Sequence, residues 1–266
     1  MDLRSYASNV TSQFGEDGII GEILQIIGSE VPKFCVEFGA WDGRHLSNTW
    51  TLINHQGWSG CLIEAHPGRY KTLQRTYSTN PKVTTLNALV TDRSAPDTSL
   101  NQLLDSIDAP KSMGLLSIDI DGNDYNVWRD FDLFTPAIVV IEYNYTIPPT
   151  VEYIDDGGRS FMGSSALALN LLARSKGYRL VACTIANCIF VRHDLSEKFG
   201  DYNDTVDALM PRDGLTFFAR NFAGEVVLSS DNVAGPMIKF IGYRSPRKWV
   251  KFGLGRRTFH YLGRST

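Results

Sequence analysis

The sequence predicts an α/β fold with a mostly parallel central sheet of about seven strands, flanked by helices. Short apolar runs of strand length alternate with segments of helical periodicity along most of the chain. Such alternation is typical of βαβ units, in which successive strands run parallel. Two later apolar runs, 178–182 and 188–191, are separated by only a tight turn. We therefore expect them to form an antiparallel pair at one edge of the sheet.

The predicted elements follow one another in a regular order. The first helix is expected over 13–27, where isoleucines recur at helical spacing and Gly28 ends the pattern. The other predicted helices are 45–57, 68–77, 100–107 and 164–176. The predicted strands are 34–38, 60–63, 82–90, 114–118, 137–141, 178–182 and 188–191. We divide the chain into a domain of residues 1–230, with an N-terminal helical cover over 5–30, and a C-terminal extension of residues 231–266.

Composition excludes several classes of protein. The chain has 266 residues, of which 43% are hydrophobic and 21% charged, values that fit one large globular domain and neither disorder nor a fibre. No apolar stretch approaches the length of about 18 residues that spans a membrane, and the N-terminus lacks the apolar region of a secretory signal. The four cysteines stand singly in apolar runs, which predicts buried thiols. We expect a cytoplasmic location.

Ligands of open α/β sheets bind beyond the carboxyl ends of the strands, so the residues at these ends are the candidates for a binding site. The first predicted strand runs into a turn with Gly39 and Gly43, where backbone can approach a ligand closely. This turn is not the GxGxxG of nicotinamide-dependent oxidoreductases, which disfavours that function. Glu64 ends the second strand about 20 residues later, where a carboxylate can accept hydrogen bonds from ribose hydroxyls. Either feature alone is also compatible with an ordinary βα connection.

The fourth and fifth predicted strands end in a dense group of oxygen-bearing side chains. Asp119, Asp121 and Asp124 follow the fourth strand, and Glu142 and Asn144 follow the fifth. Carboxylates this close repel one another unless a cation neutralises them, and such ligands suit Mg²⁺, Mn²⁺ or Ca²⁺. The spacing does not match an EF-hand loop. For the second and third aspartates, the alternative is a structural role at the start of the following helix.

Five motifs in this order resemble the FkbM-type methyltransferase family, over roughly residues 10–195. They are SQFGEDG (12–18), VEFGAWDG (36–43), LIEAHP (62–67), LLSIDIDGNDYNVW (115–128) and VVIEYNYTIPP (139–149). The resemblance implies a Rossmann-like class I methyltransferase fold that binds S-adenosylmethionine. It also implies which residues lie along the methionine, ribose and adenine portions of this cofactor. They are Glu37, Gly39, Ala40, Gly43, Glu64, Ala65, Asn87, Ala88 and Asp119.

The run IDIDGNDY is also similar to the metal-binding run of cation-dependent O-methyltransferases. By this similarity, the ligands of Mg²⁺ or Mn²⁺ would be Asp119, Glu142 and Asn144. The lysine of that pattern is Gly122 here, so a lysine base is excluded at this position. Asp121 is then the candidate proton acceptor, with His66 as the second candidate. His66 fits a role at the start of a helix equally well.

The expected reaction is methylation of a hydroxyl group on a sugar, a glycan or another small polyhydroxylated acceptor. The preference for a sugar comes from the family resemblance alone. Gln13, Glu16 and Asp17 would either cover the cofactor or form an ordinary polar helix start. The long segment 145–163 is a candidate lid over the site. Assembly into a homo-oligomer is compatible with these features.

The C-terminal extension suggests an alternative function. No acidic residue follows Asp231, whereas eight basic residues do, and aromatic residues are interleaved with them. Such a segment would suit peripheral contact with a membrane surface or an anionic partner, or it packs its aromatics on its own domain. The alternative is therefore a non-catalytic protein that keeps the fold and binds an anionic partner through this tail. Nucleic acid is not the expected partner. The carboxylates at the strand ends argue against the non-catalytic alternative, because without a metal they would repel an anionic ligand.

Overall fold

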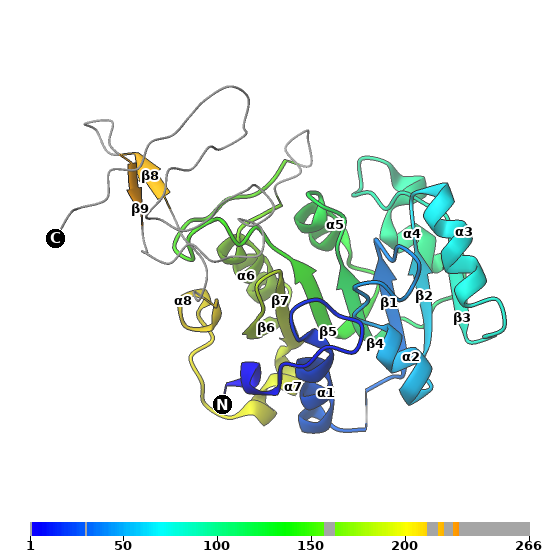
Figure 1. Cartoon of the computed structure of the whole chain (residues 1–266), viewed down its shortest axis with the longest axis horizontal. Helices are drawn as coiled ribbons and strands as arrows, with labels where there is room; N and C mark the ends of the chain where they lie inside the picture. The colour runs from blue at the N-terminus through cyan, green and yellow to red at the C-terminus, as the bar shows by residue number, and fades with distance from the viewer. Residues whose placement is uncertain (1, 30, 157–162, 212–217, 221–225, 229–266) are drawn as a thin grey trace, which may run out of the picture. The chain divides into compact units, whose positions relative to one another are not determined.

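A seven-stranded sheet organises the first part of the chain in the computed structural model (Figure 1). The strands run in the order β3-β2-β1-β4-β5-β7-β6, and β7 is antiparallel to both of its neighbours while the others are parallel. This order is that of the Rossmann-like class I methyltransferase fold, so the predicted fold class and the antiparallel edge pair are confirmed. The strands are β1 (Phe34–Phe38), β2 (Ser59–Ile63), β3 (Val83–Leu86), β4 (Ser112–Ile118), β5 (Thr135–Glu142), β6 (Tyr178–Cys183) and β7 (Asn187–Arg192).

The structure describes residues 2–29, 31–156, 163–211, 218–220 and 226–228. The predicted C-terminal extension, 231–266, and part of the candidate lid, 157–162, lie outside these residues. A second compact unit comprises 145–148 and 211–266, and its described part includes the antiparallel hairpin of β8 (Phe218–Arg220) and β9 (Val226–Leu228). The predicted division of the chain at residue 230 stays a prediction.

Helices cover both faces of the sheet. The α-helices are α1 (Glu16–Ile27), α2 (Trp50–Gln56), α3 (Pro67–Thr76), α4 (Leu100–Asp105), α5 (Asp124–Asp130), α6 (Ala166–Ser175), α7 (His193–Ser196) and α8 (Val206–Leu209). The 3₁₀ turns are η1 (Leu3–Tyr6), η2 (Pro96–Thr98) and η3 (Glu197–Phe199). No helix among the described residues is long and apolar enough to cross a membrane. All four cysteines are buried free thiols, as predicted.

One continuous core joins α1, α2 and α3 to a single face of the sheet. Ile20 and Ile23 of α1 are buried there, and each such side chain contributes about 1.5–3 kcal/mol by leaving water. Most strand residues of this core are spaced two apart, because side chains alternate between the two faces of a sheet. These strand residues include Cys35, Leu62, Leu115, Ile138, Val140, Ile189 and Val191.

Two predicted elements are shorter in the structure by five residues or more, for identifiable reasons. The helix predicted over 45–57 begins only at Trp50, because Leu46 has a left-handed φ of 57° and the residues after it are bonded to Glu37. The strand predicted over 82–90 ends at Leu86. Directly after it, the Asn87 side chain donates hydrogen bonds to backbone carbonyls beyond β2, and the chain leaves the sheet.

Candidate cofactor and cation site

A row of polar positions crosses the sheet just beyond this core. The register pairs Phe38 with Ile63 and with Ile118, and Ile118 with Ile141. One residue further along each strand, on the face covered by α1 to α3, the row continues from β2 to β7. Its members are Glu64, Gly39, Asp119, Glu142 and Asn187. The predicted ribose-binding glutamate, the glycine turn and two predicted metal ligands therefore lie along one line, at the sheet edge where this type of fold binds ligands.

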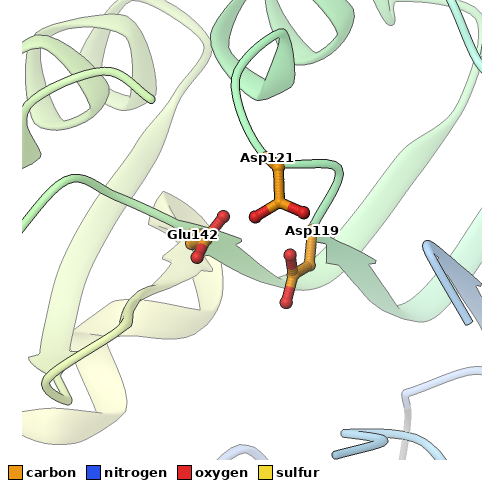
Figure 2. Close-up of side chains that lie close together, drawn as sticks. All are labelled: Asp119, Asp121 and Glu142. Atoms are coloured by element: carbon orange, nitrogen blue, oxygen red, sulfur yellow. The ribbon is translucent and has the colours of Figure 1, made fainter. Parts of the chain in front are cut away.

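Three carboxylates of this region converge on one point (Figure 2). Asp119 follows β4, Asp121 lies in the next loop, and Glu142 ends β5; each has an oxygen within 4.8 Å of the others. The protein around Asp119 removes water from its carboxylate and so raises its pKa, and the negative charges of Asp124 and Asp121 raise this pKa further. Burial and the neighbouring Asp119 likewise raise the pKa of Glu142. A divalent cation would replace this mutual repulsion by attraction, and three carboxylate oxygens are a donor set that fits Mg²⁺ or Mn²⁺.

A fourth carboxylate, that of Asp124, fixes the loop that carries Asp121. Asp124 is 1% exposed and accepts hydrogen bonds from the backbone N–H groups of Ile120 and Gly122, both at 2.9 Å. Burial raises the pKa of Asp124, and these two hydrogen bonds oppose the shift. Asp121 itself is exposed and has a left-handed φ of 57°. Asp124 thus stabilises the loop, and Asp121 faces the cluster.

The two glycines after β1 are needed for packing. Gly39 has φ +75°, and a Cβ there would lie 1.8 Å from the backbone oxygen of Asp119. Gly43 has φ +78°, and a Cβ there would lie 2.5 Å from the Tyr77 ring. Ala40, between them, is buried. The close approach at Gly39 therefore brings the end of β1 against the residue that begins the carboxylate cluster.

Glu37 anchors the loop that follows the glycine turn. Its buried carboxylate accepts hydrogen bonds from the Ser47 hydroxyl at 2.6 Å, the Asn48 backbone N–H at 2.8 Å and the Thr49 hydroxyl at 2.7 Å. Burial raises the pKa of Glu37, and these hydrogen bonds oppose the shift. The carboxylate predicted to line the methionine portion of the cofactor therefore also fixes the loop beside that position.

Hydrogen bonds of Glu64 connect the segments that follow β1, β2 and β3. Its buried carboxylate accepts hydrogen bonds from the backbone N–H groups of Trp41 at 2.9 Å and His66 at 2.7 Å. The Asn87 side chain donates to the backbone oxygens of Glu64 and Ala65, at 2.8 and 3.1 Å. The predicted ribose and adenine residues, including the half-buried Ala88, are thus brought to one side of the glycine turn.

The two candidate proton acceptors have different surroundings. The δ nitrogen of His66 accepts hydrogen bonds from the backbone N–H groups of Gly68 and Arg69 and caps the start of α3. This is the helix-start role expected as its alternative. Asp121 lies in the carboxylate cluster. Asn144, the third predicted metal ligand, is buried two residues beyond Glu142, and its backbone N–H donates to the Ser164 oxygen at 2.9 Å.

The acidic residues at the start of α1 hold other segments in place. Asp17 accepts hydrogen bonds from the backbone N–H groups of Val10, Thr11 and Ser12. Glu16 is completely buried and binds Thr184 and Asn187 at the β6–β7 turn. Gln13, the third polar residue of this segment, is exposed.

Sequence reasoning missed three residues at this edge of the sheet. Trp41 donates its backbone N–H to Glu64. The Arg69 guanidinium lies over the Trp41 ring, 3.6 Å from the ring centre. Asn187 faces the same side as the carboxylates. The sequence signal for Asn187 was its position as a polar residue directly before the apolar run 188–191.

Comparison with known proteins gives distant structural matches. No family model and no curated protein matches the chain. A SAM-dependent methyltransferase of Aquifex aeolicus is similar at 8% identity and a TM-score of 0.39, over 66% of this chain and 88% of that one. TrmK of M. capricolum, solved with S-adenosylhomocysteine, is similar at 9% identity and 0.40, over 75% and 77%. The CMeT domain of the citrinin polyketide synthase matches at 13% and 0.40, over 61% of this chain and 46% of its own length. Similarities this distant do not identify a reaction, and the fold assignment rests on the strand order.

Proposed function

We propose that this chain is an S-adenosylmethionine-dependent O-methyltransferase of the FkbM type, assisted by a divalent cation. The observation that carries the proposal is the carboxylate cluster of Asp119, Asp121 and Glu142 beside the glycine turn of a class I methyltransferase sheet. A sheet edge with the Glu64 carboxylate on one side, where it could bind a ribose, and three converging carboxylates on the other suits a nucleoside cofactor next to a cation.

The polar row at the ends of the strands could bind the ribose of the cofactor at Glu64 and its methionine portion beside Gly39. Glu64 already accepts two backbone N–H groups, but a carboxylate has about four acceptor positions, so it can also accept ribose hydroxyls. Gly39 and Ala40 leave little side-chain bulk where the methionine portion would lie. Asp119 stands between this region and Glu142, which supports a position of the reacting methyl group near the cluster.

The reaction would be an in-line displacement. The acceptor hydroxyl oxygen forms a bond to the methyl carbon, the bond from that carbon to the sulfonium sulfur breaks, and the hydroxyl loses its proton. A divalent cation bound by Asp119, Glu142 and Asn144 would lower the pKa of the acceptor hydroxyl and orient it. Asp121 is exposed beside these ligands, so it can receive the proton and release it to solvent.

The acceptor class that we propose is a sugar, a glycan or another small polyhydroxylated molecule. A polyhydroxylated acceptor can offer more than one oxygen to the same cation, which would fix the hydroxyl to be methylated. The choice of a sugar is supported by the family resemblance of the five motifs.

The test is calorimetric titration with S-adenosylhomocysteine and with Mn²⁺. We expect the chain to bind S-adenosylhomocysteine, and we expect Asp119→Asn to abolish Mn²⁺ binding. Asp97→Asn removes an exposed carboxylate from η2 and is the matched control, which should bind Mn²⁺ as the unaltered chain does. Failure to bind S-adenosylhomocysteine would refute the methyltransferase proposal. Mn²⁺ binding that survives Asp119→Asn would refute the cation site.

A further inference from the structure

Asn187 carries a buried oxygen that calls for a ligand. The side chain is 5% exposed, and its Oδ1 has no hydrogen-bond partner among the described residues. Buried polar oxygens are nearly always paired with protein or with ordered water, because an unpaired one destabilises the fold. A group that donates a hydrogen bond is therefore expected at this oxygen.

The neighbours of Asn187 fix which way its amide group points. Its Nδ2 donates to Glu16 Oε1 at 3.0 Å, and the Thr184 hydroxyl donates to the same oxygen at 2.6 Å. The backbone N–H of Phe14 donates to Glu16 Oε2 at 2.7 Å. An ionised carboxylate only accepts hydrogen bonds, so turning the amide over would place two oxygens against each other. Glu16 therefore keeps Oδ1 of Asn187 directed away from itself.

The position of Asn187 in the sheet places it beside the carboxylate cluster. It is directly opposite Glu142 in the antiparallel β5–β7 pair, and opposite residues share a face with Cβ atoms about 4.5–5.5 Å apart. The cluster extends from Glu142 toward Asp119, one strand further on. Neighbouring strands lie about 4.8 Å apart, so a cation midway between Asp119 on β4 and Glu142 on β5 would lie roughly 7 Å from the β7 backbone. The short Asn187 side chain does not span that separation with direct coordination at about 2.1 Å. A water molecule on the cation would bridge that separation.

We propose that Asn187 Oδ1 accepts a hydrogen bond from a water molecule coordinated to the cation, and that Glu16 is the positioning residue that holds the amide in this orientation. The inference rests on the proposed cation site. Partners that bond to the ligands of a metal commonly change its affinity about 10–100-fold when they are removed. Asn187 and Glu16 would therefore set the affinity for the cation without touching it.

The first test measures Mn²⁺ binding by calorimetry in Asn187→Leu, a replacement of similar size with no acceptor. The dissociation constant should rise about tenfold, while binding of S-adenosylhomocysteine stays unchanged. Asn170→Leu is the matched control. Asn170 has the same 5% exposure and an Oδ1 with no partner in the described part of the chain, but it lies on α6, outside the core that joins α1 to the sheet. Unchanged Mn²⁺ affinity in Asn187→Leu would overturn the inference.

The second test leaves residue 187 intact. In Glu16→Gln, the arrangement that satisfies every group keeps the Gln oxygen on the Phe14 N–H and points the new NH₂ at residue 187. Asn187 would then turn over and present its own NH₂ to the coordinated water. We expect Mn²⁺ affinity to fall here too, and an unchanged affinity would overturn the role of Glu16. An unaltered chain that binds S-adenosylhomocysteine but no Mn²⁺ would instead refute the cation site itself.

Discussion

Substituting Gly39 by alanine would test how closely the cofactor turn and the carboxylate cluster depend on each other. The new Cβ would lie 1.8 Å from the backbone oxygen of Asp119, at a position whose φ is +75°. The left-handed conformation costs about 1–2 kcal/mol for a residue with a Cβ. Overpacking against a backbone atom costs about 1–3 kcal/mol more, because relief requires β1 and β4 to separate. We expect a loss of about 2–5 kcal/mol in the free energy of unfolding.

Gly177 offers a control that isolates the conformational part of this loss. It has φ +80°, but a Cβ there would meet no atom within 4 Å. Gly177→Ala should therefore cost only the strain, about 1–2 kcal/mol, with the same effect on the unfolded chain. Urea denaturation of both variants gives the difference, and Mn²⁺ titration shows whether the displaced Asp119 still binds. Equal losses in the two variants, with Mn²⁺ binding intact, would refute the account of this turn.

Three further outcomes are expected. The raised pKa values of Asp119 and Glu142 mean that the folded chain binds more protons than the unfolded chain, so the free energy of unfolding without metal should fall as the pH rises above about 4. The gain in Tm on adding Mn²⁺ should accordingly be larger at pH 8 than at pH 6. A smaller gain at pH 8 would contradict this. Burial opposes ionisation of Asp17, but backbone hydrogen bonds outweigh it and lower its pKa, so Asp17→Asn should cost about 1–3 kcal/mol at pH 7 in urea unfolding; this deficit should narrow below about pH 4. His66→Ala should lose only a helix cap, about 1 kcal/mol, with methyl transfer retained once an acceptor is known; loss of transfer in a folded variant would restore His66 as a proton acceptor.

Local pattern was enough to predict most of the fold. Residues 34–38 were predicted as a strand and form β1, and the isoleucine spacing of α1 with Gly28 at its end located that helix. The signal failed where a distant partner decides the conformation. The segment 45–49 has helical spacing, but Glu37 binds Ser47, Asn48 and Thr49 and holds them outside the helix.

The candidate site was predictable only in part. Carboxylates at the ends of consecutive strands indicated that Asp119 and Glu142 would meet with Asp121 beside them, and the structure brings all three together. Asn187 could not be found this way, because its place opposite Glu142 depends on the β5–β7 register. The bond between Glu16 and Asn187 joins residues that are 171 positions apart, a separation that no local pattern reports.

The most direct measurement is a crystal structure of the chain grown with S-adenosylhomocysteine and Mn²⁺, with anomalous data collected at the manganese edge. The account predicts one strong anomalous peak between Asp119 and Glu142, beside Asp121, with the nucleoside beside Gly39 and its ribose at Glu64. A manganese peak elsewhere, or S-adenosylhomocysteine bound away from the glycine turn, would contradict it.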